Sequence, residues 1–303
     1  MSVSLRARVG TVELVGPVMT AAGTAGFGDE LAGYGDLAEL GAVVTKSVAP
    51  FAWDGNPAPR LATSGAHLVN SVGLAGPGVE AWLRDDAPAL RARGATIVVS
   101  VWGRRVEDYE AAAAALAPAP VAAIEVNASC PNVEDRAAMF AHSARATAAL
   151  VSAARVGGHP VWVKLSPNTP ELIAIAEAAV SAGADALVLV NALLGMVVDI
   201  ERRAPALGAV GGGLSGPGLG PVALRAVYDC RGALPTTPIV GVGGIASGRD
   251  AIAMLMAGAN AVQVGTATFA DPRAPWRVQR GVAHWMARHG VKTVAELVGA
   301  GRA

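Results

Sequence analysis

Short apolar runs alternate along the chain with longer runs of helical period. The apolar runs are rich in Val, Ile and Leu, and several lack polar alternation, which is typical of strands covered on both faces. We predict eight strands, at residues 14–20, 42–46, 96–101, 121–127, 161–165, 186–191, 238–242 and 261–265. Helical periods lie between them, at residues 29–40, 106–116, 170–182 and 249–257.

This alternation indicates an α/β protein with a parallel sheet, and a closed (β/α)₈ TIM barrel suits it better than an open sheet. A chain of 303 residues could form two domains, but single barrels reach this size. We therefore predict one domain over residues 1–303. Two Gly/Pro-rich segments, 47–76 and 194–221, are too long for simple connections, and we expect them to be functional.

Polar residues follow the predicted strands at the points where the strands end. A parallel barrel gathers these ends on one face, where such enzymes build their sites. Lysines there can hold positive charge against an anion or a reduced flavin, and glycines can present backbone N–H groups to a phosphate. The residues concerned are Lys46, Ser47, Asn127, Lys164, Asn168, Asn191, Gly243, Gly244, Gly265 and Thr266.

The most informative strand end is at residues 121–132, where an apolar run stops in a polar cluster. Asn127, Ser129 and Asn132 can all form hydrogen bonds, and Cys130 lies among them. These residues fit two interpretations. One is an ordinary turn with an inert, half-buried thiol, and the other is a reactive thiol in a site.

Composition narrows the class of partner. Hydrophobic residues make up 52% and charged residues 16%, which indicates a globular protein. Lys plus Arg, 24, equals Asp plus Glu, 24, so there is no basic footprint for nucleic acid and no polybasic membrane patch. A small-molecule substrate fits this balance better.

Cysteine and histidine usage bears on the compartment and on metals. Two cysteines form no disulfide framework or four-cysteine cluster site, and no apolar window is long enough to span a membrane, so we expect a cytoplasmic protein. The five histidines show no metal-ligand spacing, and we propose no metal site. Residues 211–216 fit the GxGxxG spacing, but no convincing strand precedes them, so we reject a dinucleotide fingerprint.

Nine stretches together carry a resemblance to class 1 dihydroorotate dehydrogenases, and most closely to the 1B catalytic subunit. Their residues and order along the chain match that family at 23–28, 44–47, 55–60, 70–74, 127–132, 163–168, 191–196, 213–216 and 264–266. The resemblance implies FMN-dependent oxidation of dihydroorotate to orotate in pyrimidine biosynthesis. It also implies a homodimer and a separate electron-transfer subunit, with FAD and an iron–sulfur cluster, that passes electrons to NAD.

The resemblance assigns roles residue by residue. Cys130 would be the general base, and Lys46 would lie between the flavin and the substrate carboxylate. The other substrate-binding residues would be Asn70, Ser71, Val72, Gly73, Leu74, Asn127, Asn132, Asn191 and Ala192. FMN would contact Lys46 and Asn127 as well as Ala21, Ala22, Gly23, Ser47, Ser100, Lys164, Val190, Gly216, Gly243, Gly244, Gly265 and Thr266.

Three departures from the family pattern keep alternatives open. Ser100 stands where an asparagine is usual, Ala192 replaces a hydroxyl residue, and the segment after Val133 lacks the usual glycines. A lost hydrogen bond costs about 0.5 to 1.5 kcal/mol, enough to weaken substrate binding several-fold. The alternatives are a related FMN oxidoreductase acting on another dihydropyrimidine, and a fumarate-linked class 1A acceptor. A non-enzymatic regulatory barrel would require the polar strand ends to be coincidental.

Overall fold

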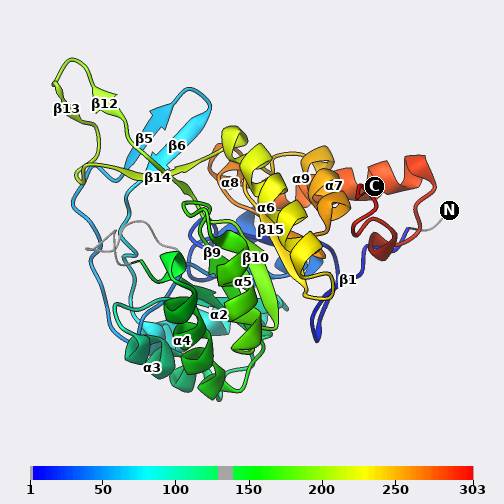
Figure 1. Ribbon diagram of the computed structural model, residues 1–303, viewed down its shortest axis with the longest axis horizontal. Helices are drawn as coiled ribbons and strands as arrows, with labels where there is room; N and C mark the ends of the chain where they lie inside the picture. Colours follow the sequence, from blue (N-terminus) through cyan, green and yellow to red (C-terminus); the bar gives the residue numbers. More distant parts are fainter. Residues whose placement is uncertain (1–2, 129–138, 303) are drawn as a thin grey trace.

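A computed structural model describes residues 3–128 and 139–302, and Figure 1 shows its arrangement. A parallel eight-stranded sheet forms a barrel, as predicted. In spatial order its strands are β3 (Val18–Thr20), β16 (Ala261–Val264), β15 (Ile239–Val242), β10 (Ala186–Leu189), β9 (Val161–Leu165), β8 (Ala123–Asn127), β7 (Ile97–Val101) and β4 (Val43–Val44). All eight are buried, which explains why their sequences lack polar alternation.

The seam between β3 and β4 is closed by one side chain together with the backbone. The Thr20 hydroxyl accepts a hydrogen bond from the Val44 N–H at 2.8 Å and donates one to the Val44 carbonyl at 3.2 Å. Backbone bonds from Gly41 to Val18 and from Thr20 to Ala42 continue the seam. The sheet therefore has no free edge at this position.

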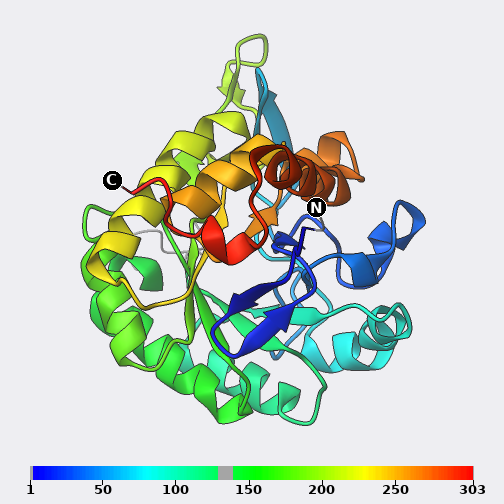
Figure 2. The same cartoon turned by 90° about the vertical axis from the view of Figure 1, so that its right-hand side faces the viewer.

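Helices surround the barrel, as Figure 2 shows. They are α1 (Val79–Asp85), α2 (Ala87–Ala92), α3 (Val106–Leu116), α4 (Ala144–Ala154), α5 (Leu172–Ser181), α6 (Gly220–Ala233), α7 (Gly248–Ala257), α8 (Ala267–Ala270) and α9 (Ala274–His289). In α3, the buried residues Tyr109, Ala112, Ala113 and Leu116 recur at helical spacing and face the core. A reciprocal cap between Ser247 and Asp250 fixes the start of α7.

Two of the predicted elements differ from the structure. The run 14–20 is interrupted at residues 15–17, and its first residue, Leu14, belongs to a separate antiparallel hairpin of β1 (Ala7–Val9) and β2 (Val12–Leu14). The predicted helix at 29–40 is wrong, because the chain forms two short 3-10 helices there, Glu30–Gly33 and Leu37–Glu39. Gly33, Gly35 and Asp36 disfavour a continuous α-helix in this segment.

The two long segments pair with each other instead of forming separate loops. They build a four-stranded antiparallel sheet in the order β11 (Leu193–Gly195), β14 (Gly212–Ser215), β6 (His67–Asn70) and β5 (Leu61–Ser64). A small hairpin, β12 (Val198–Asp199) with β13 (Ala204–Pro205), extends from it. This sheet projects from one end of the barrel (Figure 1) and forms part of the wall above the strand ends. Residues 211–216 lie partly in β14, which leaves no room for a strand–turn–helix fingerprint.

Candidate active site

A cavity of about 410 Å³ opens at the carboxyl ends of the barrel strands. This volume lies in the range of cofactor and substrate pockets. The predicted residues that line it are Ala21, Ala22, Gly23, Lys46, Ser47, Asn70, Val72, Gly73, Leu74, Asn127, Lys164, Val190, Asn191, Ala192, Gly216, Gly243, Gly244, Gly265 and Thr266. The strand ends and both inserted segments therefore meet at one site.

Two predicted residues lie behind the lining. Ser100 is fully buried in β7, and its hydroxyl is 2.8 Å from that of Ser47. Ser71 is also fully buried and accepts a hydrogen bond from the Asn56 side chain at 2.8 Å. Cys130 and Asn132 lie outside the described residues, so their predicted roles remain predictions.

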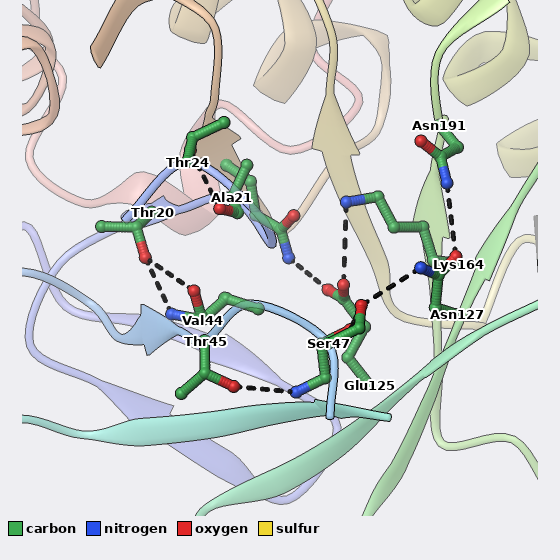
Figure 3. A network of polar contacts seen from close by, with 12 residues as sticks. Thr20, Ala21, Thr24, Val44, Thr45, Ser47, Glu125, Asn127, Lys164 and Asn191 are labelled. Atoms are coloured by element: carbon green, nitrogen blue, oxygen red, sulfur yellow. Dashed lines mark hydrogen bonds and ion pairs between the residues drawn. The ribbon is translucent and has the colours of Figure 1, made fainter. Parts of the chain in front are cut away.

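A chain of hydrogen-bonded side chains crosses the floor of the cavity. Asn191 donates to the Asn127 side-chain oxygen at 3.3 Å, and Asn127 donates to the Ser47 hydroxyl at 3.1 Å, as Figure 3 shows. The Tyr109 hydroxyl donates to the backbone carbonyl of Asn127 at 2.9 Å, which fixes the end of β8. Linked amides in fixed orientations suit a ring ligand that offers both donors and acceptors.

Lys46 directly precedes the inserted segment 47–76, and two contacts hold its side chain. Its ammonium donates to the Ala75 carbonyl and lies 4.9 Å from the centre of the Phe27 ring. Both contacts suit an ammonium group and restrict where its charge can point. This geometry keeps a cation beside the segment 70–74.

That segment is shaped by residues outside the cavity lining. The indole N–H of Trp53 donates to the Gly73 carbonyl at 2.9 Å, and the Asn56 N–H donates to the Val72 carbonyl at 3.1 Å. Leu74 adopts a left-handed φ of +65°, a conformation that needs such external support. No pattern in the amino-acid sequence indicates the role of Trp53, because its contact is to a backbone atom 20 residues away.

A cradle of glycine backbone forms the opposite end of the cavity. Gly243 and Gly244 have positive φ values of +125° and +70°, and a Cβ at Gly244 would lie 2.3 Å from the Cα of Gly220. Only glycine allows this close approach. Beside it, the Thr266 hydroxyl donates to that of Ser215 at 2.7 Å. Exposed backbone N–H groups and hydroxyls in such a pocket suit a phosphate.

Lys164 reaches the cavity from β9 and is backed by a carboxylate that sequence reasoning missed. Its Nζ lies 3.7 Å from Oε1 of Glu125, and the side chains are 6% and 0% exposed. At an effective dielectric constant of about 20, such a pair attracts by roughly 4 kcal/mol before desolvation is counted. Gln263 donates to Oε2 of Glu125 at 2.6 Å. The feature of the sequence that could have indicated this pair is a charged residue in the middle of the apolar strand at 121–127.

The rim carries further residues that sequence reasoning missed. Arg277 and Asp271 line the cavity and form an ion pair of 2.9 Å on its more exposed side. Phe269 also lines it and is 56% exposed. Phe269 lies in α8, Asp271 follows it, and Arg277 lies in the first turn of α9. No strand-end pattern points to these positions.

The described residues contain no group of three or more His, Cys, Asp or Glu side chains that could hold a metal ion. His67, at the start of β6, instead accepts a hydrogen bond from the Gly218 N–H at 3.0 Å. Within the same part of the chain, no helix combines the length and the apolar character needed to cross a membrane.

Comparison with known proteins gives consistent matches. A family model described as dihydroorotate dehydrogenase matches residues 4–286. A protein of Alkaliphilus oremlandii named dihydroorotate dehydrogenase B (NAD(+)), catalytic subunit, is 46% identical over 95% of both chains. Two further proteins carry the same name. The one from Desulforudis audaxviator is 45% identical over 99% of this chain and 98% of its own length. The one from Alkaliphilus metalliredigens is 44% identical over 98% of both chains.

Proposed function

This chain belongs to the dihydroorotate dehydrogenase family, and from that premise we propose that it oxidises dihydroorotate to orotate in de novo pyrimidine biosynthesis. The observation that supports this most directly is the meeting of Lys46, the Asn127 and Asn191 amides, and Lys164 at one cavity. The cavity thus offers two cations and a set of oriented amides to one ligand assembly. A carboxylated dihydropyrimidine beside an electron-accepting ring needs these groups.

We further propose that the flavin of this family is FMN here. The residues fit such a cofactor, because the Gly243 and Gly244 backbone and the Thr266 hydroxyl line the cavity and can form a phosphate cradle. A Cβ at Gly244 would clash with the Gly220 backbone and displace this cradle. Ala21, Ala22, Gly23, Ser47 and Val190 would contact the ring and its chain, with Gly216 and Gly265 completing the cradle. Ser100 would act on the cofactor through Ser47. When bound, FMN supplies the hydride acceptor.

The remaining roles concern the substrate. Lys46 would pair with the substrate carboxylate, and the residues that would hold the pyrimidine edge are Asn70, Val72, Gly73, Leu74, Asn127, Asn132, Asn191 and Ala192. Ser71 would support this set from behind the lining, because its side chain is fully buried and bonded to Asn56. Cys130 would take the C5 proton as its thiolate while hydride leaves C6. A thiol pKa near 8.5 is close enough to neutrality for this role.

Partners follow the names of the relatives. They are catalytic subunits of NAD(+)-type enzymes, so we propose that this chain passes electrons to a separate subunit carrying FAD and an iron–sulfur cluster, and then to NAD. We also propose a homodimer of single-domain FMN-binding chains in the cytoplasm. A fumarate-linked acceptor is the alternative, and NAD reduction that appears only after the partner subunit is added would exclude it.

One observation favours a second substrate. Ala192 lines the cavity without a hydroxyl, and its N–H donates to the Asn191 side chain at 2.8 Å. A site with one fewer hydrogen-bonding group could accept another dihydropyrimidine. Bleaching of the flavin by that compound, with none by dihydroorotate, would select this alternative.

The test is the reductive half-reaction of the purified chain. We expect flavin absorbance that is released as FMN and that bleaches on anaerobic addition of dihydroorotate. Cys130→Ala should keep its FMN but lose most of the reduction rate at neutral pH. Cys230→Ala is the matched control, because the Cys230 thiol is buried in α6 and outside the cavity lining. A colourless protein that cannot be reconstituted with FMN would falsify the proposal.

A further inference from the structure

Glu125 is a buried carboxylate to which the proposed function assigns no role. It lies in the middle of β8, is 0% exposed and does not line the cavity. One oxygen accepts from Gln263, while the other has no hydrogen-bond partner in the described structure and lies 3.7 Å from the Lys164 ammonium (Figure 3). A buried carboxylate is costly unless a cation offsets it, so Lys164 and Glu125 act as a unit.

The two members of this unit differ in what they face. Lys164 lines the cavity and is 5% exposed, whereas Glu125 lies one layer deeper in the barrel. The Lys164 ammonium therefore has a carboxylate behind it and the ligand space in front. A flat ring in that space would displace the water that solvates the ammonium from the front.

Few other charged groups face Lys164. In the described structure, the other ionisable side chains that line the cavity are Lys46, Asp271 and Arg277, and the last two pair with each other. Strands β8, β9 and β10 contain no ionisable residue besides the pair itself. Glu125 is therefore the nearest anion to Lys164 among the described residues, and Lys46 adds a like charge to the same cavity.

We propose that Glu125 keeps Lys164 protonated while an oxidised, uncharged flavin ring covers it. This inference rests on the proposed function. Oxidation of dihydroorotate forms the C5=C6 bond of orotate, sends the C5 proton to the base and transfers hydride from C6. The ring thereby gains two electrons, one hydrogen and one negative charge. Because Lys164 already carries its proton, it balances this charge at once.

The charge state of Lys164 decides how many protons accompany the two electrons. With Lys164 charged throughout, the ring takes up two electrons and one proton when it is reduced in solution. In Glu125→Gln the shape and the Gln263 contact remain, but the carboxylate charge is gone. A buried cation without its counter-charge is disfavoured, so Lys164 loses its proton under the oxidised ring and regains it when the ring becomes anionic. Two protons then accompany two electrons.

The experiment is a spectroelectrochemical titration of the FMN-loaded protein at several pH values near neutrality. For a two-electron couple, a tenfold change in equilibrium constant corresponds to about 30 mV. The midpoint potential of the native protein should therefore fall by about 30 mV per pH unit, and that of Glu125→Gln by about 60 mV. Equal slopes in the two proteins, or the steeper slope already in the native protein, would overturn the inference.

A matched background tests whether Glu125 acts through Lys164. In Lys164→Met the lysine charge is absent, so adding Glu125→Gln should leave the slope where Lys164→Met alone puts it. A further change of slope on adding Glu125→Gln means that Glu125 acts independently of the lysine, which contradicts the inference.

Two measurements keep the outcomes apart. If Glu125→Gln does not fold, the double variant Glu125→Gln with Lys164→Gln should fold, because it leaves no buried charge unpaired. If the double variant also misfolds, the role of Glu125 is in the fold alone. FMN loading of the native protein and its bleaching by dihydroorotate are checked first. Their absence defeats the proposed function, whereas a reducible flavin with unchanged slope in Glu125→Gln defeats only the role of Glu125.

Discussion

Thr20→Val is the most direct test of how the barrel is closed. Valine keeps the volume and the β-branch of threonine but removes the hydroxyl that bonds both the N–H and the carbonyl of Val44. Thr20 is 0% exposed, so water does not replace the lost partner without opening the seam. The perturbation therefore removes two hydrogen bonds with little change in packing.

The magnitude follows from the groups left behind. A buried N–H without a partner costs about 1 to 3 kcal/mol, and the carbonyl adds to this, while the new methyl group recovers part. We expect a free energy of unfolding lower by about 2 to 3 kcal/mol. At roughly 2 °C per kcal/mol for a chain of this size, the melting temperature should fall by about 4 to 6 °C.

Thr268→Val provides the matched control. Thr268 is 3% exposed, and its hydroxyl has no hydrogen-bond partner in the described structure. The same substitution there removes only an unsatisfied hydroxyl, so stability should stay unchanged or rise by up to about 1 kcal/mol.

The assay is urea unfolding of both variants and the native protein at one protein concentration, together with amide hydrogen exchange. Exchange of the Val44 N–H should be faster in Thr20→Val and unchanged in Thr268→Val. If the two variants unfold within about 0.5 kcal/mol of each other, the hydroxyl does not hold the seam and the reasoning is wrong.

Three further predictions concern the site. Gly244→Ala should weaken FMN binding at least about 100-fold, because the methyl group and the φ of +70° are incompatible with the cradle; equilibrium dialysis with FMN measures this. Trp53→Phe should raise KM for dihydroorotate about 2- to 10-fold without changing FMN affinity, since it removes the hydrogen bond to the Gly73 carbonyl. Steady-state kinetics measures KM, and equilibrium dialysis measures FMN affinity. Burial raises the pKa of the Cys230 thiol to about 12, so iodoacetamide at neutral pH should modify only Cys130, as peptide mass spectrometry would reveal.

Each of these has an outcome that contradicts it. Gly65→Ala, at a positive φ of +58° with open space around the added methyl, should leave FMN binding unchanged, and an equal loss in both glycine variants would remove the cradle argument. A Trp53→Phe protein with native KM would show that Gly73 needs no anchor. Alkylated Cys230 in the folded protein would mean that α6 opens readily.

Elements with local signals could be predicted from the amino-acid sequence alone. All eight barrel strands lie inside the predicted apolar runs, although the first run, 14–20, is interrupted before β3. Helix α3 begins and ends at the predicted residues. Both results follow because burial and helical period can be recognised in short windows of sequence. The strand-end residues Lys46, Asn127, Lys164 and Asn191 could also be placed together in advance, since a parallel barrel brings all carboxyl ends to one face. Recognition of the family then assigned their expected roles.

Which distant groups come into contact could be read only from the folded barrel. The pairing of Asn70 with Gly213, 143 residues apart, makes one sheet from two segments that had appeared as separate insertions. Likewise, the sequence shows Glu125 within an apolar strand, but its partners Lys164 and Gln263 come from other strands, β9 and β16. Such contacts depend on how the barrel closes, and no pattern along a single strand encodes them.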